Sequence, residues 1–283
     1  YGENIISTRD SGFLAIGATE SYGNGLTDMY FVKTDKDGNV LWHKAYGGAN
    51  IDYGKSVVET LDSGFIACGY SNSENLNYDI FLVKINKNGI LQWSKSIGGN
   101  DWDFGNRIIK SVIDSNHFYV VGKTFNYGSI NGDAFVLKIN SLGDSLWMKT
   151  YGGNMEDEFE DVIQSENGNL YCIGNNKSAK PEPRLWISCQ SENGDTIWNY
   201  YSDSTFSTGR SITKVEEKIV FCGSVKRSKT NNTTANLYYL IGGIDTLGND
   251  LFHADYPYFS IVEESCVKVI KKSNSNNYHL ISN

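Results

Sequence analysis

The sequence predicts an all-β protein, a β-propeller built from four-stranded antiparallel blades. A string that joins a glycine turn to a tryptophan recurs along the chain, as at 36–48 and 87–99. The repeat is about 52 residues long, a period that is typical of solenoids and propellers. Each repeat contains four short apolar runs. Gly, Asn, Ser and Tyr are plentiful while Pro is rare, which favours short strands and tight turns.

Two series of residues mark the copies. The first is aromatic: Trp42, Trp93, Trp147, Trp198 and Phe252. The second follows an apolar run in every full copy: Gly17, Gly69, Gly122, Gly174 and Gly223. We therefore expect five complete repeats and half of a sixth within a single propeller domain over 1–283, at about 1–50, 51–100, 101–154, 155–204, 205–260 and 261–283. An open propeller would expose the surface between blades. We therefore expect the intact protein to continue beyond this chain and to have six or seven blades.

The second copy shows the four expected strands in order. They fall at 55–60, 65–70, 79–85 and 90–96, and all are rich in β-branched and aromatic residues. The second and third runs are apolar at consecutive positions, which indicates strands covered on both faces. The fourth run alternates, as an exposed edge strand does. Asn88-Gly89 supplies the tight turn before the fourth strand.

The tryptophan of each copy falls on the fourth strand, where we expect its ring to fill the gap between neighbouring blades. The five cysteines are odd in number and lack metal-ligand spacing. Cys68 and Cys222 stand in matching apolar strings, so we expect buried thiols and no disulfide between these two. The four histidines are scattered, and no metal site is expected from them.

Charge and hydropathy exclude two classes of partner. The formal net charge of −8 and the isoelectric point of about 5.1 give no basic field for a phosphate backbone, so nucleic acid is not an expected partner. No apolar run approaches the roughly 20 residues needed to cross a bilayer, so no membrane-spanning segment is expected.

The repeat resembles that of the bacterial β-propeller-repeat family, in which copies carry Gly-Gly-x-x-x-Asp-x-Gly, Asp-x-Phe-Val-x-Lys and Gly-x-x-x-Trp motifs. The first three copies place Asp and Lys as the motif does, at Asp28/Lys33, Asp79/Lys84 and Asp133/Lys138. The fourth has Arg184 and Cys189 there, and the fifth has Tyr238 and Gly243. The resemblance implies a bacterial protein, secreted or at the cell surface, that is used for binding or display. It implies no catalytic residues.

Loop lengths indicate where a binding site would lie. The turns after the first and third strands are short and uniform, whereas the loops after the second strand and between blades are long and varied. In an up-and-down blade the two varied classes emerge on one face, where binding residues tend to sit. The candidate ligand-binding residues on that face are Tyr22, Asp52, Tyr78, Trp102, Asp103, Phe125, Tyr127 and Asp157. Exposed rings beside carboxylates suit a glycan or a basic polypeptide.

These residues favour a non-enzymatic, extracellular or cell-surface module that binds or displays a glycan or protein partner. Asp52 and Asp103 could instead cap the turn that enters the first strand. The alternative function is an extracellular polysaccharide-active enzyme, a hydrolase or lyase, or its accessory domain, with a carboxylate pair such as Asp103 and Asp157. No cofactor is expected. A calcium ion at the acidic strings 100–103 and 154–158 is a weaker alternative, because they lack the ligand spacing of a calcium loop.

Overall fold

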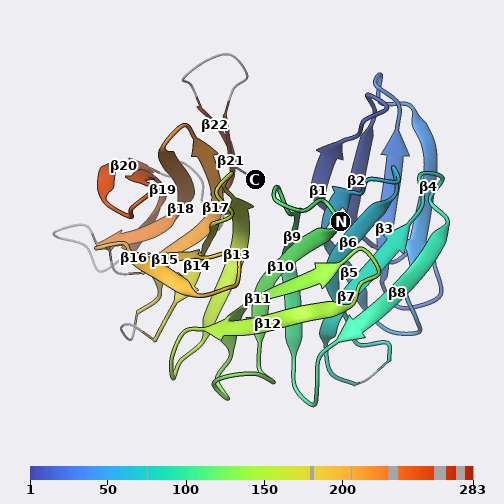
Figure 1. Cartoon of the computed structure of the whole chain (residues 1–283), viewed down its shortest axis with the longest axis horizontal. Helices are drawn as coiled ribbons and strands as arrows, with labels where there is room; N and C mark the ends of the chain where they lie inside the picture. The colour runs from blue at the N-terminus through green and yellow to red at the C-terminus, as the bar shows by residue number, and fades with distance from the viewer. Residues whose placement is uncertain are drawn as a thin grey trace. The chain divides into compact units, whose positions relative to one another are not determined.

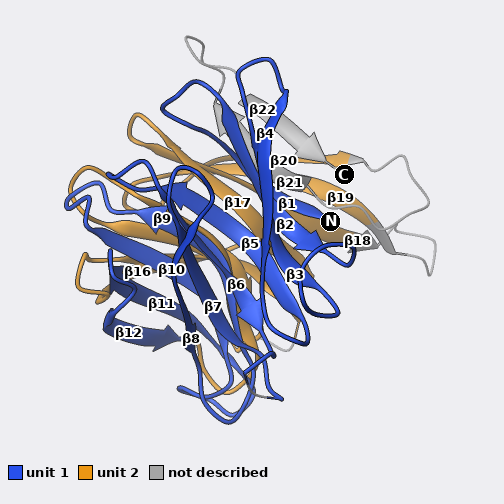
Figure 2. Ribbon diagram, turned by 90° about the vertical axis from the view of Figure 1, so that its right-hand side faces the viewer, with its two compact units in different colours: residues 1–151 blue, residues 152–283 orange. Residues whose placement is uncertain are grey.

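The structure is a computed structural model of the 283-residue chain. It describes residues 1–74, 76–178, 182–204, 206–228, 235–257, 266–271 and 278–282, and these ranges contain β-strands, turns and loops but no helix. The chain divides into two compact units, 1–151 and 152–283, drawn in blue and orange in Figure 2. The expectation of one domain over 1–283 stays a prediction.

Unit 1 holds three blades, each a sheet of four antiparallel strands in sequential order (Figure 1). The first is β1 (Gly2–Ser7), β2 (Phe13–Thr19), β3 (Asp28–Thr34) and β4 (Val40–Tyr46). The second is β5 (Asp52–Glu59), β6 (Phe65–Ser71), β7 (Asp79–Ile85) and β8 (Leu91–Ile97). The third is β9 (Asp103–Lys110), β10 (His117–Thr124), β11 (Asp133–Asn140) and β12 (Ser145–Tyr151).

Unit 2 holds two blades of the same kind. The fourth blade is β13 (Asp157–Gln164), β14 (Leu170–Asn176), β15 (Arg184–Gln190) and β16 (Thr196–Tyr201). The fifth is β17 (Ser207–Val215), β18 (Lys218–Ser228), β19 (Ala235–Asp245) and β20 (Asp250–Pro257). β21 (Cys266–Lys271) and β22 (Tyr278–Ser282) pair as a two-stranded sheet, and β21 lies beside β17. The five predicted repeats and the half repeat are confirmed.

The hydrophobic core lies between successive blades. In unit 1, Leu14 and Phe31 of the first blade pack in one cluster with Phe65 and Val83 of the second. In unit 2 one cluster likewise combines residues of the fourth and fifth blades. Second and third strands are the most buried and fourth strands the least, as β7 and β8 show. The predicted gradient of burial across each blade is confirmed.

The repeated tryptophans occupy equivalent places on the fourth strands, and Phe252 holds the same register. Each lies opposite the same position of the third strand: Trp42–Lys33, Trp93–Lys84, Trp147–Lys138, Trp198–Cys189 and Phe252–Gly243. Within the units, half-buried rings lie against the turn glycine of the next blade: Trp42 on Gly89, Trp93 on Gly143 and Trp198 on Gly248. These three glycines have positive φ values of 75°, 77° and 88°. The tryptophans therefore fill the joints between blades, as the sequence predicts.

The repeated glycine of the second strand is required by a bulge in the first. In the second blade the pairing of β5 with β6 shifts between Gly54 and Ser56. There the carbonyl oxygen of Tyr53 comes so close to Gly69 that any Cβ on Gly69 would overlap it. Gly122 meets the carbonyl oxygen of Phe104 in the same way. The glycine series therefore records a close backbone approach rather than a turn.

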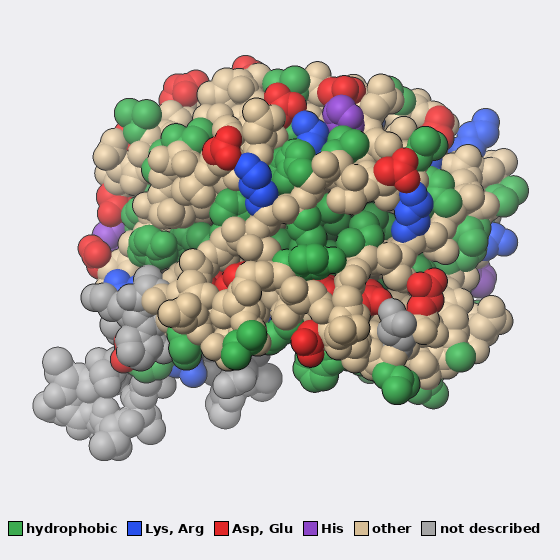
Figure 3. Space-filling model, turned by 60° about the horizontal axis from the view of Figure 1, so that its bottom comes forward, with side chains coloured by type: hydrophobic (Ala, Val, Ile, Leu, Met, Phe, Trp, Pro, Cys, Tyr) green, Lys and Arg blue, Asp and Glu red, His purple; other side chains and the backbone are tan. Residues whose placement is uncertain are grey.

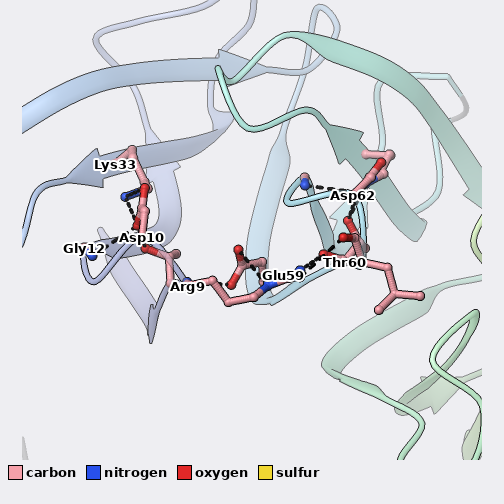
Figure 4. Close-up of polar contacts among 11 residues, drawn as sticks. Arg9, Asp10, Gly12, Lys33, Glu59, Thr60 and Asp62 are labelled. Carbon is pink, nitrogen blue, oxygen red and sulfur yellow. Dashed lines mark hydrogen bonds and ion pairs between the residues drawn. The ribbon is translucent and has the colours of Figure 1, made fainter.

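The motif lysine of the third strand is buried and braces the first turn of its own blade, as Figure 4 shows for Lys33. Lys33 Nζ lies 3.0 Å from Asp10 Oδ2, and Lys84 Nζ lies 2.8 Å from Asp62 Oδ1. Asp62 also accepts hydrogen bonds from Thr60 and Gly64. Although burial raises the pKa of the Asp62 carboxyl, these partners together hold it at about 2. The ion pair therefore fixes the turn at neutral pH.

Candidate functional site

The candidate site lies at the end of the strands that carries the long loops, in unit 1. The three candidate carboxylates at this end of the strands are buried. Asp52 is 1% exposed, and Asp103 and Asp157 are 0% exposed. Gly48 N and the Ser73 hydroxyl donate to Asp52 Oδ2 at 2.7 Å each. The turn-capping alternative therefore describes these side chains, because their oxygens accept bonds from the loop that enters each first strand.

Two buried carboxylates meet at the joint of the first and second blades. Asp28, at the start of β3, accepts hydrogen bonds from Asn24 N and Gly25 N on its Oδ2. Its Oδ1 and the Oδ2 of Asp52 both lie against Gly47, where a Cβ would overlap them. Burial raises the pKa of Asp28, and the negative charge of Asp52 adds to the effect. The first position of the Gly-Gly motif therefore has to be glycine, because any side chain there would overlap the two carboxylates.

The joint of the second and third blades repeats this arrangement with Asp79 and Asp103, which meet at Gly98. Burial raises the pKa of Asp103 to about 6, and the charge of Asp79 acts in the same direction. Hydrogen bonds from Thr124, Asn126 and the backbone of Gly99 oppose this shift. A raised carboxyl pKa often marks a functional site. Here the carboxyl is fully buried, so it does not reach a substrate in this conformation.

The two varied loops of the third blade converge. Phe125 N donates to Trp102 O at 2.9 Å, and the Tyr127 hydroxyl donates to Gly98 O at 3.4 Å. Asn126 ties the loops together, since its Nδ2 lies 2.6 Å from Asp103 Oδ2 and 2.7 Å from Asp101 O. The loop geometry is therefore set by the buried Asp103.

Four rings next to these loops form what we call the aromatic cluster: Tyr70, Tyr78, Trp102 and Phe104. Tyr70 and Phe104 come from β6 and β9, and their ring centroids lie 5.2 Å apart in an edge-to-face arrangement. Tyr78 lies 5.4 Å from Tyr70 and 6.0 Å from Trp102. Trp102 is 52% exposed, whereas the other three rings are half-buried. The cluster therefore presents a half-exposed indole on a base of three half-buried rings.

A cation and further rings border the aromatic cluster. Lys123 Nζ lies 5.7 Å from the ring centroid of Phe104 and 5.5 Å from that of Phe125, within cation–π range. On the other side Tyr53 stacks on Tyr70 at 5.3 Å. The structure thus brings the predicted Tyr78, Trp102 and Phe125 together. It places Tyr22 elsewhere, 5.7 Å from Tyr30 and 5.1 Å from His43.

Sequence reasoning missed Tyr70, Phe104, Lys123 and Asn126. An available signal was the aromatic residue that follows the motif aspartate in the second and third copies, Tyr53 and Phe104. Another was the small polar residue four positions after the repeated glycine, which is Ser73, Asn126 or Ser178. In the structure Ser178 and Asn126 donate to Asp157 and Asp103, just as Ser73 donates to Asp52.

Unit 1 has a pocket at each end of its strands. One, of about 320 Å³, lies on the loop side of the first joint and is lined by Asn24, Gly48, Asp52, Ser73 and Glu74 among others. The second lies at the opposite end of the strands. No group of three or more His, Cys, Asp or Glu side chains placed to hold a metal occurs among the described residues. Calcium binding at the acidic loops stays a prediction.

The surface drawn in Figure 3 mixes side chains of every type. Apolar patches alternate there with separate acidic and basic groups. Within the described ranges, none of the residues forms a helix of the length and apolarity needed to cross a membrane. Four cysteines, Cys68, Cys172, Cys189 and Cys222, are buried and not in disulfide bonds, as expected for the two in matching strings. Burial raises the pKa of Cys68 to about 12.

Comparison with solved structures defines the class of protein. The chain is similar to the WD40 domain of Pan2 from Neurospora crassa, with a TM-score of 0.59 and 11% identity, over 95% of this chain and 68% of that one. It is also similar to a protein of unknown function from Bacteroides caccae, with a TM-score of 0.53 and 10% identity, over 90% and 81%. A third match is the GH93 α-L-arabinofuranosidase of Fusarium graminearum, with a TM-score of 0.50 and 10% identity, over 72% and 66%.

At these identities the likeness concerns the fold alone. Together with the five four-stranded sheets, it shows that the chain has a β-propeller fold. No family model matches the chain, and no curated protein matches its sequence.

Proposed function

We propose that the protein is a non-enzymatic binding module that holds a polypeptide or glycan partner on the aromatic cluster. The observation that carries the proposal is the half-exposed indole of Trp102, which lies against the rings of Tyr78 and Phe104. The Lys123 ammonium group lies over the same Phe104 ring. A rigid ring offers a large contact area and loses little conformational entropy on binding. Lys123 adds a donor for a carboxylate or hydroxyl of the partner.

The buried carboxylates have a supporting role in this proposal. Asp103 holds Asn126, which in turn holds the loop before Trp102 and the loop after β10 in one arrangement. A preorganised surface of this kind binds more tightly than a mobile one, because fewer side chains must be ordered on association. We propose an extracellular or cell-surface setting, which the resemblance to the bacterial propeller-repeat family supports.

The test is a glycan array and a pull-down of surface proteins, each run with the wild-type chain and with Trp102→Ala/Tyr127→Ala. Both side chains are about half exposed, at 52% and 44%, so the double variant should fold normally. Asp37→Ala is the matched control, because Asp37 is an exposed turn residue at the opposite end of the strands. Loss of a bound partner in the double variant alone supports the proposal. Turnover of a polysaccharide by the purified protein would refute the binding-module assignment.

A further inference from the structure

A second pocket lies at the other end of the strands, between the second and third blades. Its volume is about 270 Å³, and its walls come from the turn after β5, the start of β8 and two turns of the third blade. The sequence predicts that this end is plain, because its turns are short and uniform. The pocket is separate from the aromatic cluster, since the two lie at opposite ends of a four-stranded meander.

The pocket lies where the second joint lacks a bridge that the first joint has. In the turn of the first blade, Arg9 reaches across the joint to the second blade, where it pairs with Glu59 at 3.3 Å and donates to the carbonyl oxygens of Thr60 and Leu61 (Figure 4). The second blade has Leu61 in the place of Arg9, and the third has Lys110 in the place of Glu59. An alkyl side chain makes none of these bonds, so the bridge is missing at this end of the second joint, where the pocket opens beside Trp93.

The lining of this pocket is polar and balanced in charge. Lys84 and Asp62 form an ion pair at its base, so neither sign of charge dominates. Gln92 and Asn116 contribute amide groups that both donate and accept hydrogen bonds. Leu61 and the half-buried ring of Trp93 supply apolar walls.

Such a lining matches the chemistry of an uncharged sugar. A pyranose presents hydroxyl groups at its rim and C–H groups on its faces, so it can use the amides and the indole at once. A net charge on the ligand would face either Asp62 or Lys84 unfavourably at close range. The volume is below the usual range for drug-sized ligands, which limits the occupant to about one ring. We propose that this pocket binds a single uncharged pyranose residue.

The experiment uses saturation-transfer NMR on the whole chain with D-glucose, D-galactose, D-mannose and N-acetyl-D-glucosamine as probes. Leu61→Phe should fill the pocket, and Asn116→Ala should remove an amide from its wall. Leu41→Phe is the control, because Leu41 is 57% exposed on the first blade and lies outside the pocket. At least one probe should receive saturation from the wild-type chain and from Leu41→Phe, with a loss of tenfold or more in Leu61→Phe and Asn116→Ala.

Two results would overturn the proposal: no probe receives saturation, or saturation persists in both pocket variants. If the signal falls in Trp102→Ala instead, the sugar occupies the aromatic cluster and the pocket proposal is wrong. Thermal unfolding of each variant shows whether it is still folded. If Leu61→Phe is unstable, Asn116→Ala decides alone, because the Asn116 side chain is exposed and its truncation should preserve the fold.

Discussion

The ring of Trp93, on the outer strand of the second blade, lies against Gly143, a turn residue of the third blade with φ of 77°. The same contact joins Trp42 to Gly89 and Trp198 to Gly248. In each case the tryptophan of one copy packs against the turn glycine of the next copy. Each copy therefore stabilises its neighbour.

Removing the Trp93 ring should show how much the packing between two blades contributes to the stability of the fold. Trp93→Ala should lower the free energy of unfolding by about 3 kcal/mol, at the low end for a large ring because Trp93 is only half-buried. Denaturant unfolding monitored by circular dichroism, which should show almost no helix, measures the change. A loss below about 1 kcal/mol would mean that the ring contributes little to the joint.

The close backbone approach at the repeated glycine predicts that adding a single methyl group there destabilises the fold at least as much as removing the Trp93 ring. Gly122→Ala places a Cβ against the carbonyl oxygen of Phe104, so it should cost about 3 kcal/mol or more, or prevent folding. Gly2→Ala is the matched control, since nothing lies within 4 Å of the Cβ it would add. Equal stability of the two variants would contradict the proposed reason for the glycine series.

The carboxylate pair at the second joint predicts a pH dependence. The pKa of Asp103 is raised to about 6 in the fold, so between about pH 4 and 6 the folded chain binds more protons than the unfolded one. Its contribution to stability is therefore present at low pH and is lost as the pH rises through 6. Asp103→Asn should flatten this part of the stability profile. An unchanged slope in the variant would show that Asp103 titrates normally.

The buried cysteines predict slow thiol labelling. Cys68 and Cys222 are fully buried, and burial raises the pKa of the Cys68 thiol to about 12, so little thiolate is available at neutral pH. A thiol reagent should modify both only after unfolding, as peptide mass spectrometry would record. Rapid labelling of Cys68 in the native chain would contradict its placement in the core.

The strands and the tryptophan register could be predicted from the sequence because both depend on local patterns. The runs at 65–70 and 79–85 have strand length, and the turn at Asn88-Gly89 sets the start of the next strand. The approach of Asp52 to Asp28 at Gly47 could not be predicted in this way, because the two carboxylates come from different blades. The pairing explains the first glycine of the Gly-Gly motif, Gly47, whereas the second, Gly48, lies against Ser73.

The aromatic cluster was only half predictable for a similar reason. Trp102 and Tyr78 stand in varied loops and were therefore expected to be near the surface, but their base is Tyr70 and Phe104, which lie on strands of two different blades. The pocket between the second and third blades could not be predicted, because the turns "TRDSG" and "TLDSG" look alike. Arg9 bridges the first joint by pairing with Glu59, whereas the second joint has Leu61 and Lys110 in their places.

The most direct test of the binding proposal is the dissociation constant of the partner recovered from the array or pull-down, measured by calorimetry for wild-type, Trp102→Ala and Asp37→Ala chains. We expect Trp102→Ala to weaken binding at least tenfold, which corresponds to about 1.4 kcal/mol, and Asp37→Ala to leave it unchanged. Unchanged affinity in Trp102→Ala, or a loss confined to Asp37→Ala, would contradict binding at the aromatic cluster.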